Sequence, residues 1–396
     1  MKQKIYFLAL IAFLCSCSPA KQIFQGGRLS ETNFITKIPF NFDYDIPIIT
    51  VEIEGKSYRF LFDTGAPTVL SPEIAALLKL KVHTDGTASD SQGNSSARQF
   101  VVIPNMKIGN LNFENTGALV IDLKASFDFR CVNLDGLIGS NQMAKAIWEI
   151  DYQQKIITAS NQLSNFDTNV ASEVIAFVPK KDQLTPLVPI KIGGKTAYAT
   201  FDSGSSGGFN LAVDHFNDEI ADFKKVDAVG SSATGVYGSN KATLSSYVKV
   251  PTFNIGPVVL ENQILEFQTN SSNTVGNSFI KNYKVVLNWA ENKIYMLQQT
   301  PFKKTKLTQF GAIIKFASSK PTIAKIYKNS DAEKLGLLVN DEVIAINGKD
   351  TANFSDSQGC YYLLNYILDG MDTAVITVLR GGKKVDFSLK KTLWLE

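Results

Sequence analysis

From about Phe40 onward, the chain alternates short apolar runs with turns rich in glycine, asparagine, aspartate and serine. Residues 48–53 form one such run, residues 54–57 interrupt it, and a second run follows at 58–62. Short runs of β-branched and aromatic residues between turn residues predict strands joined by hairpins. Helices are expected to be few, although Ser71-Pro72-Glu73 predicts a helix start, because serine caps a helix and proline fits its first turn. The pattern therefore predicts a mostly β protein.

An internal repeat organises most of this pattern. Residues 51–65 and 190–204 both read as a strand, a turn containing Gly-Lys, a second strand and then Phe-Asp-(Thr/Ser)-Gly. The repeat places Asp63 and Asp202 at equivalent positions, 139 residues apart. Self-similarity of this kind indicates a duplicated structural unit.

The repeat continues downstream in the same order. Residues 136–140 (Gly-Leu-Ile-Gly-Ser) correspond to 273–277 (Asn-Thr-Val-Gly-Asn), with Gly139 and Gly276 137 residues apart. Residues 148–156 then correspond to the segment from 285 to 294. Two landmarks at nearly one offset indicate two homologous lobes.

We therefore expect lobe 1 to span 45–163 and lobe 2 to span 172–300, with a polar connector between them. A change of composition follows Pro301, and a lysine-rich linker precedes a third domain of a different kind at 305–396. Residues 18–44 are expected to be a tether before the first lobe.

The two Asp-(Thr/Ser)-Gly motifs, each after an apolar strand and before an apolar-apolar-Gly segment, resemble those of the aspartic peptidases of the pepsin and retropepsin superfamily. The lobes look shorter than pepsin lobes and are more similar to a duplicated bacterial retropepsin-like unit. The resemblance covers both lobes and implies two pseudo-symmetric β-barrel lobes with Asp63 and Asp202 as the catalytic pair. Because one chain supplies both aspartates, a monomer is sufficient for the site.

The motif residues have physical roles in such a site. The hydroxyls of Thr64 and Ser203 can bond across to the partner loop, and Gly65 and Gly204 allow a tight turn that brings an N–H to the carboxylate. Two adjacent carboxylates hold one proton between them, so an ionised and a protonated member can together activate a water molecule against a peptide bond. The expected substrate is an extended polypeptide, and neither a metal nor an organic cofactor is needed.

Two features depart from the family pattern or extend it. Ala66 follows the first motif, where pepsins commonly have a serine, although alanine is common there in retropepsins. Covering flaps are expected at the Gly/Ser-rich segments 89–97 and 230–240. Tyr237 is a candidate flap tyrosine, with a solvent-exposed loop tyrosine as the alternative.

The third domain resembles the PDZ fold. It has a short helix start at 330–333, then Gly-Leu, then Asn340-Asp-Glu-Val-Ile-Ala-Ile-Asn-Gly, with Asn340 and Asp331 replacing a usual glycine and proline. Ser330 and Glu333 predict a capping box and Gly336 a C-cap. The resemblance implies a small α+β domain, with a helix near 358–368 beside a peptide groove.

Its peptide-carboxylate loop would contain Phe310, Gly311 and Ala312, which could receive the C-terminus of a partner peptide through backbone N–H groups. The alternative is a packing module that only braces the two lobes.

The N-terminus reads as an export signal. A short basic segment precedes an apolar run at 5–14, which is too short for a membrane-spanning helix. Leu14-Cys15-Ser16-Cys17 resembles a bacterial lipobox, which implies a signal peptide at 1–17 and acylation of Cys17. We expect an exported protein held by lipid on the periplasmic or surface face of a bacterial membrane. The alternatives are an ordinary secretory signal with two incidental cysteines and a short anchor.

The remaining composition narrows the function. Net charge is +3 without a long basic run beyond the N-terminus, which argues against nucleic-acid binding. Cys131 and Cys360 are interpreted as buried thiols, with a bridge between them left open as an alternative. Two histidines in the whole chain argue against a histidine-based triad or metal site.

Two rival functions remain. One is an inactive peptide-binding scaffold, and the other is a hydrolase with Ser203 or Ser205 as nucleophile, which has no Gly-x-Ser-x-Gly context.

Overall fold

The computed structural model describes residues 19–396 except 90–93, 236–237, 240–243, 317–319 and 366–367. Strands take up 49% of the structure and helices 15%, so the expectation of a mostly β fold is confirmed. The predicted signal peptide with Cys17 and the candidate flap residue Tyr237 lie outside the described residues. No helix within the described part of the chain is long and apolar enough to cross a membrane.

The first barrel closes on itself through six strands, which pair in the cyclic order β3-β4-β9-β5-β8-β7. These strands are β3 (Ile48–Ile53), β4 (Lys56–Asp63), β5 (Val69–Leu70), β7 (Ser95–Ile108), β8 (Leu111–Val120) and β9 (Gly136–Gly139). Edge strands β1 (Arg28–Leu29) and β6 (Thr84–Ser89) pair with β8 and β7. The helices of this part are α2 (Pro72–Leu77), η1 (Leu123–Ala125), α3 (Phe127–Val132) and α4 (Ser140–Met143).

The second barrel repeats that strand order as β14-β15-β22-β16-β21-β20, with β14 bonded back to β20. Its strands are β14 (Pro186–Ile192), β15 (Lys195–Phe201), β16 (Phe209–Ala212), β20 (Leu244–Ile255), β21 (Val258–Gln268) and β22 (Thr274–Val275). Added to it are β13 (Val178–Pro179), β17 (Lys225–Gly230), β18 (Thr234–Gly235), β19 (Gly238–Ser239), η4 (Val213–His215), α5 (Asn217–Ile220) and α6 (Asn277–Ile280). Each element of the sequence repeat thus occupies the same place in its own barrel.

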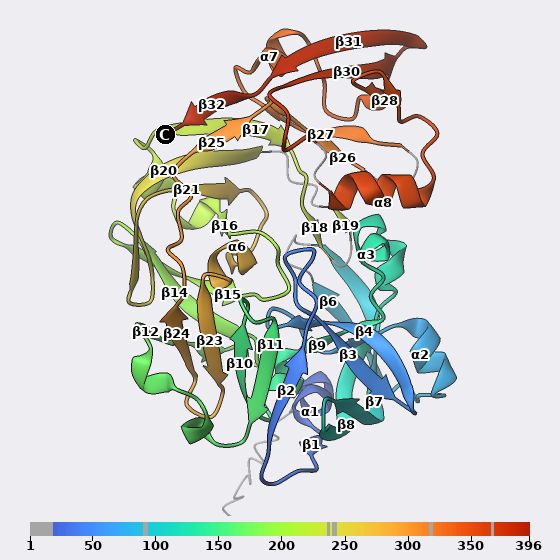
Figure 1. The fold of residues 1–396 in the computed structure, drawn as a ribbon, viewed down its shortest axis with the longest axis vertical. Helices are drawn as coiled ribbons and strands as arrows, with labels where there is room; N and C mark the ends of the chain where they lie inside the picture. The colour runs from blue at the N-terminus through green and yellow to red at the C-terminus, as the bar shows by residue number, and fades with distance from the viewer. Residues whose placement is uncertain (1–18, 90–93, 236–237, 240–243, 317–319, 366–367) are drawn as a thin grey trace, which may run out of the picture.

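A six-stranded antiparallel sheet joins the two barrels at their base (Figure 1). Its order is β12 (Glu173–Ala176), β24 (Lys293–Gln298), β23 (Tyr283–Asn288), β10 (Ile147–Asp151), β11 (Ile156–Ser160) and β2 (Ile35–Pro39). The downstream landmarks of the repeat are the β10–β11 and β23–β24 hairpins, which meet along β10 and β23. Two 3-10 turns, η2 (Leu163–Asn165) and η3 (Thr168–Val170), lie in the predicted connector.

The segment 18–44, expected to be a tether, is built into the fold from Pro19 on. It contains α1 (Pro19–Gln25), β1 and β2, and Phe24 of α1 is buried. In β2 the side chains of Thr36 and Ile38 are buried while their neighbours are exposed. This alternation is the period of a strand with one buried face, so the segment completes the sheet rather than hanging free.

The C-terminal domain has an α+β composition. Its elements are β25 (Leu307–Gln309), β26 (Ala312–Lys315), β27 (Thr322–Tyr327), α7 (Asp331–Lys334), β28 (Glu342–Ile346), β29 (Lys349–Asp350), α8 (Asp356–Leu364), β30 (Thr373–Arg380), β31 (Lys383–Lys390) and β32 (Thr392–Leu395). Ser330 caps α7 as predicted, accepting from the N–H of Glu333 at 3.0 Å. The Glu333 carboxylate instead accepts from the N–H of Asn329, so the predicted reciprocal capping box is not formed.

This domain is attached to both barrels. Strand β27 pairs with β17 and continues the sheet of the second barrel. Lys325 of β27 is buried and forms an ion pair of 2.6 Å with Glu266 of β21, and it also donates to the hydroxyl of Tyr247. On the other side, α8 lies against α3 of the first barrel (Figure 1).

The interpretation of Cys131 and Cys360 as free thiols is wrong. The two sulfurs form a disulfide that joins α3 to α8, with the Cα atoms 5.2 Å apart. The two cysteines are 229 residues apart in the sequence, and this separation does not predict a disulfide. The contact depends on how the C-terminal domain folds back over the first barrel.

Candidate active site

The two repeated aspartates lie side by side between the barrels. Asp63 is the last residue of β4, and Asp202 directly follows β15. Each of these strands is flanked in parallel by the Gly-containing segment of its own repeat, β9 beside β4 and β22 beside β15. Both strands run from an exposed start to a largely buried end, so each carries its aspartate into the interior of the molecule.

Thr64 and Ser203 bind each other's loops through reciprocal hydrogen bonds. The Thr64 N–H donates to Oγ of Ser203 at 3.0 Å, and the Ser203 N–H donates to Oγ1 of Thr64 at 2.9 Å. The Thr64 hydroxyl donates to the Phe201 carbonyl at 2.5 Å, and the Ser203 hydroxyl donates to the Phe62 carbonyl at 2.7 Å. These four bonds fix the two aspartate loops to one another.

Gly65 and Gly204 allow the carboxyl groups to approach. The N–H of Gly65 donates to Asp63 at 2.7 Å, and that of Gly204 donates to Asp202 at 2.9 Å. A Cβ at Gly65 would overlap the carboxyl of Asp202, and a Cβ at Gly204 would overlap that of Asp63. Each glycine is therefore required for space, because the carboxyl of the other barrel lies where its side chain would be.

The residues that follow Gly139 and Gly276 each support the aspartate loop of their own barrel. Ser140 Oγ donates to the Thr64 carbonyl, and Asn277 Nδ2 donates to the Ser203 carbonyl, both at 2.6 Å. The backbone N–H groups of these two residues bond to the carbonyls of Ala66 and Ser205. Sequence comparison of the two repeats had aligned Ser140 with Asn277 but gave neither a role.

The environment makes the pair hold a proton. Burial raises the pKa of Asp63 well above its ordinary value, and repulsion from Asp202 raises it further, against the Gly65 N–H that lowers it. Burial also raises the pKa of Asp202, to about 6, while hydrogen bonds from Asp63 and from the N–H of Gly204 act in the other direction. The arrangement therefore favours a dyad that keeps a proton at a pH where separate aspartates would both be ionised.

The segments expected to form flaps are hairpin regions. In the first barrel, β6 and β7 pair from Thr84 and Phe100 out to Ser89 and Ser95. In the second barrel, β17 and β20 pair in the equivalent place, with β18 and β19 beyond them. The described parts of the predicted flap segments, which are 89 and 94–97 in the first barrel and 230–235 and 238–239 in the second, lie at the outer ends of these hairpins.

The serine-nucleophile alternative receives no support from the geometry. His215 Nδ1 is bonded to the side-chain amide of Asn273 at 2.8 Å. Among the described residues, no serine hydroxyl is hydrogen-bonded to either histidine, and the hydroxyl of Ser203 is committed to Phe62. A group of three His, Cys, Asp or Glu side chains that could hold a metal ion is also absent from the described residues.

The predicted carboxylate loop lies at the start of β26. Phe310 and Ala312 are buried, and Gly311 has a φ of +83° that suits glycine. The Gly311 carbonyl accepts from the N–H of Tyr327 at 2.9 Å. Phe127 of α3 belongs to the same apolar core as Phe310 and Ala312, so the first barrel contributes to this domain's interior.

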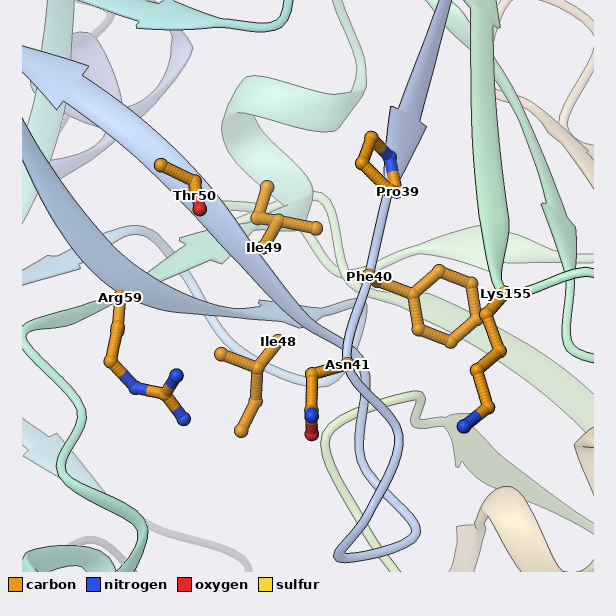
Figure 2. Close-up of a pocket in the computed structure, with 8 residues that line it drawn as sticks. All are labelled: Pro39, Phe40, Asn41, Ile48, Ile49, Thr50, Arg59 and Lys155. Carbon is orange, nitrogen blue, oxygen red and sulfur yellow. The ribbon is translucent and has the colours of Figure 1, made fainter.

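A separate cavity of about 310 Å³ lies beside the β3–β4 hairpin (Figure 2). Its lining includes apolar side chains and two cationic ones, Arg59 and Lys155. It is lined by Pro39, Phe40, Asn41, Ile48, Ile49, Thr50, Arg59 and Lys155. Neither aspartate lines this cavity, so it is distinct from the site built around them.

Comparison with known protein families gives one match. Residues 49–142 match the family model described as aspartyl protease, which makes this part of the chain an aspartyl protease-like domain. The match covers just under a quarter of the chain and includes Asp63, β9 and Ser140. No curated protein matches the chain.

Proposed function

We propose that this protein is an aspartic endopeptidase in which Asp63 and Asp202 together activate a water molecule. The observation that carries the proposal is the reciprocal bonding of Thr64 and Ser203, which supports two carboxyl groups facing each other from separate barrels. The aspartyl protease-like match over 49–142 supports the same reaction class. One chain supplies both carboxyls, so the proposed site needs no second subunit.

In the proposed reaction Asp202 acts as the general base and Asp63 as the general acid. The Asp202 carboxylate takes a proton from the water, whose oxygen attacks the scissile carbonyl carbon. Asp63 gives its proton to the carbonyl oxygen, forming a neutral tetrahedral intermediate. On collapse, the proton on Asp202 passes to the leaving nitrogen, the C–N bond breaks, and a hydroxyl proton returns to Asp63. The dyad ends with the proton arrangement in which it began.

The proposed substrate is a polypeptide in extended form. Within the described residues, β6 pairs with β7 alone, so the first barrel offers a backbone edge, and an extended peptide pairs readily with such an edge. An extended substrate also presents one peptide bond at a time to a pair of carboxyls.

We further propose that the C-terminal domain is a PDZ-like module whose main role here is to brace the barrels. The β17–β27 pairing, the buried Lys325–Glu266 ion pair and the disulfide support bracing. Binding of a partner's C-terminal peptide is a second proposed role, since the described residues give β26 no strand partner other than β27.

Export with a lipid anchor at Cys17 remains our proposal for its location. The Cys131–Cys360 disulfide supports an oxidising compartment, because such bonds are rare where thiols are kept reduced. Cys17→Ala should move the protein from the membrane to the soluble fraction of cells, and unchanged fractionation would contradict the anchor.

The proposed reaction is tested with full-length protein in detergent and a library of denatured peptides, across acid to neutral pH, with products read by mass spectrometry. Asp63→Asn and Asp202→Asn should each abolish cleavage. Asp135→Asn is the matched control, because the described residues that bond to the Asp135 carboxylate are Arg59 and Lys124, neither of them in the dyad, so cleavage should stay intact. Cleavage that survives in either dyad variant would refute the assignment, and peptide binding without cleavage by the wild type would favour a scaffold.

A further inference from the structure

The two barrels support their aspartate loops with different side chains. Ser140 has one hydroxyl proton and gives it to the Thr64 carbonyl. Asn277, its counterpart, has two amide protons and a carbonyl oxygen, and only one of these groups is needed for the Ser203 carbonyl. The second barrel therefore has two polar groups available at this position that the first barrel lacks.

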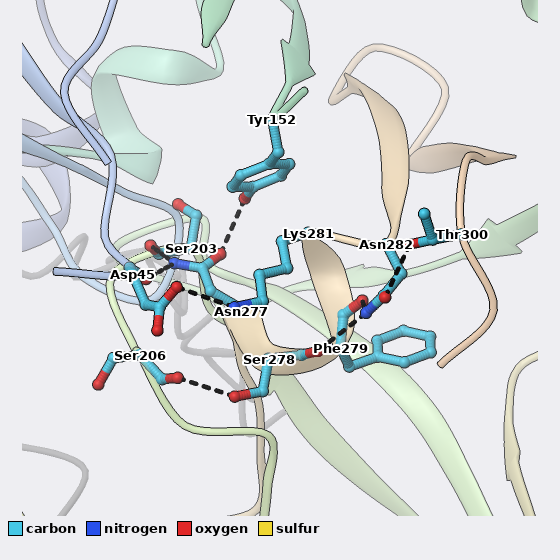
Figure 3. Close-up of polar contacts among 10 residues, drawn as sticks. All are labelled: Asp45, Tyr152, Ser203, Ser206, Asn277, Ser278, Phe279, Lys281, Asn282 and Thr300. Carbon is cyan, nitrogen blue, oxygen red and sulfur yellow. Dashed lines mark hydrogen bonds and ion pairs between the residues drawn. The ribbon is translucent and has the colours of Figure 1, made fainter. Parts of the chain in front are cut away.

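Both extra groups of Asn277 bind segments from the other half of the molecule (Figure 3). The Tyr152 hydroxyl, from the β10–β11 turn, donates to Oδ1 of Asn277 at 2.8 Å. The second amide proton is donated to the carbonyl of Asp45 at 2.9 Å. Asn277 is fully buried, and all three of its side-chain hydrogen bonds are made within the protein.

The partners of Asn277 are themselves fixed. The Tyr152 ring packs against Phe40 and Phe42, with centroids 5.9 and 5.1 Å away. Asp45 takes a positive φ of 56° and its carboxylate pairs with Lys281 of the second barrel at 2.9 Å. The amide is therefore held by groups that have little freedom to follow it if it moves.

The same chain of contacts continues to the other aspartate. Two residues after Asp45, the carbonyl of Pro47 accepts from the N–H of Phe62, which directly precedes Asp63. A continuous path thus runs from the carbonyl of Ser203, next to Asp202, through Asn277 and the 45–47 loop to the strand that carries Asp63. It joins the two aspartate segments a second time, apart from the Thr64–Ser203 bonds.

We propose that Tyr152 and Asn277 are positioning residues that fix Asp202 relative to Asp63. This inference rests on the proposed peptidase function of that pair. Without the Tyr152 hydroxyl, Oδ1 of Asn277 has no donor, and the amide gains freedom to turn away from the Ser203 carbonyl. A small misplacement of the reacting carboxyls lowers the rate of the chemical step far more than it lowers substrate affinity, because other residues contact the substrate.

The Tyr152 hydroxyl is suited to remain a donor. Burial raises the pKa of Tyr152, and the negative charge of Asp202 raises it further. The phenol therefore stays protonated throughout the range in which the dyad changes its charge. Because Tyr152 is neutral in that range, a changed titration of the dyad in Tyr152→Phe would report a changed placement of Asp202 beside Asp63 and not the loss of a charge.

The test compares Tyr152→Phe with Tyr283→Phe in full-length protein, using a peptide that the wild type cleaves. Tyr283 is the matched control because it is also buried and packs on Phe279 of α6, yet its hydroxyl forms no hydrogen bond with the described residues. Tyr152→Phe should lower kcat on the order of tenfold, about the effect of one lost hydrogen bond, and change KM less than twofold. The pH at which kcat/KM rises should also shift, whereas Tyr283→Phe should move neither quantity.

Asn277→Ser supplies a second variant that copies the first barrel. It keeps a hydroxyl for the Ser203 carbonyl but loses the bonds to Tyr152 and Asp45, so it should reproduce the kcat loss and the pH shift. Unchanged kcat and pH profile in both variants, with an active wild type, would overturn the positioning role alone. If the wild type and Asp202→Asn behave identically, the proposed peptidase function fails, and this inference fails with it.

Discussion

The reciprocal bonds between Thr64 and Ser203 make a quantitative prediction for Ser203→Ala. Both residues are at most 1% exposed, so no solvent replaces a lost partner. The substitution leaves the Thr64 N–H without its acceptor, which costs roughly 1–3 kcal/mol when buried, and removes the bond to the Phe62 carbonyl, worth roughly 1 kcal/mol. We therefore expect the free energy of unfolding to fall by about 2–4 kcal/mol.

The assay is unfolding in urea, monitored through tryptophan fluorescence. Trp148 is fully buried with its ring 5.1 Å from Phe62, so it reports on the strand that ends in Asp63. Ser203→Thr, which keeps the hydroxyl, should restore most of the loss. Ser278→Ala removes one partly exposed hydroxyl bond, to the carbonyl of Ser206, and should cost less than about 0.5 kcal/mol. Equal effects of Ser203→Ala and Ser278→Ala would refute the reasoning.

Four further predictions concern charge, the disulfide and the hairpins. Because the folded state raises the pKa of Asp202 from 3.8 to about 6, its contribution to folding stability should fall as pH rises through that window, and Asp202→Asn should reduce this slope to the part that buried Asp63 contributes. The same shift predicts that kcat/KM rises as pH passes about 6, so activity that peaks well below this value would contradict it. Replacing both Cys131 and Cys360 with serine should lower stability by at most about 5 kcal/mol from loop entropy, and reductant should remove the difference from wild type. Amides of β6 should exchange with deuterium faster than those of β17, which has a strand on each side, and equal protection measured by mass spectrometry would contradict this.

Much of the fold could be predicted from the sequence because the chain contains a duplication. A weak pattern in one copy of the repeat can be tested against the same pattern in the other copy. One Asp-Thr-Gly is a common turn, but its repetition with a matching downstream glycine identified β4 with β15 and β9 with β22. Local chemistry also predicted the start of α2, where Ser71 accepts from the N–H of Ile74 after a proline at the first turn.

Contacts between distant segments were not accessible. The strand β2 has a clear alternating pattern, yet nothing local indicates that it completes the sheet beside β11. The disulfide was likewise invisible, because Cys131 and Cys360 meet only through the docking of one domain on another. The role of Asn277 was missed for the same reason, since Tyr152 and Asp45 lie more than a hundred residues before it.

The position of the C-terminal domain makes bracing and peptide recruitment separable in this structure. Bracing uses β27, which pairs with β17, and Lys325, whose ion pair with Glu266 is buried. Although burial opposes ionisation of Glu266, the Lys325 ammonium lowers the pKa of that carboxyl overall. Breaking the contact would therefore leave a buried charge without its partner. Recruitment would instead use β26, on the other side of β27.

The two roles nevertheless meet at α3. Phe127 shares an apolar core with Phe310 and Ala312, and the disulfide holds α3 against α8. The first barrel therefore supplies part of the core behind the predicted carboxylate loop. Because α3 leads directly into the segment before β9, the strand beside Asp63, this core connects the C-terminal domain to an element that supports the candidate active site.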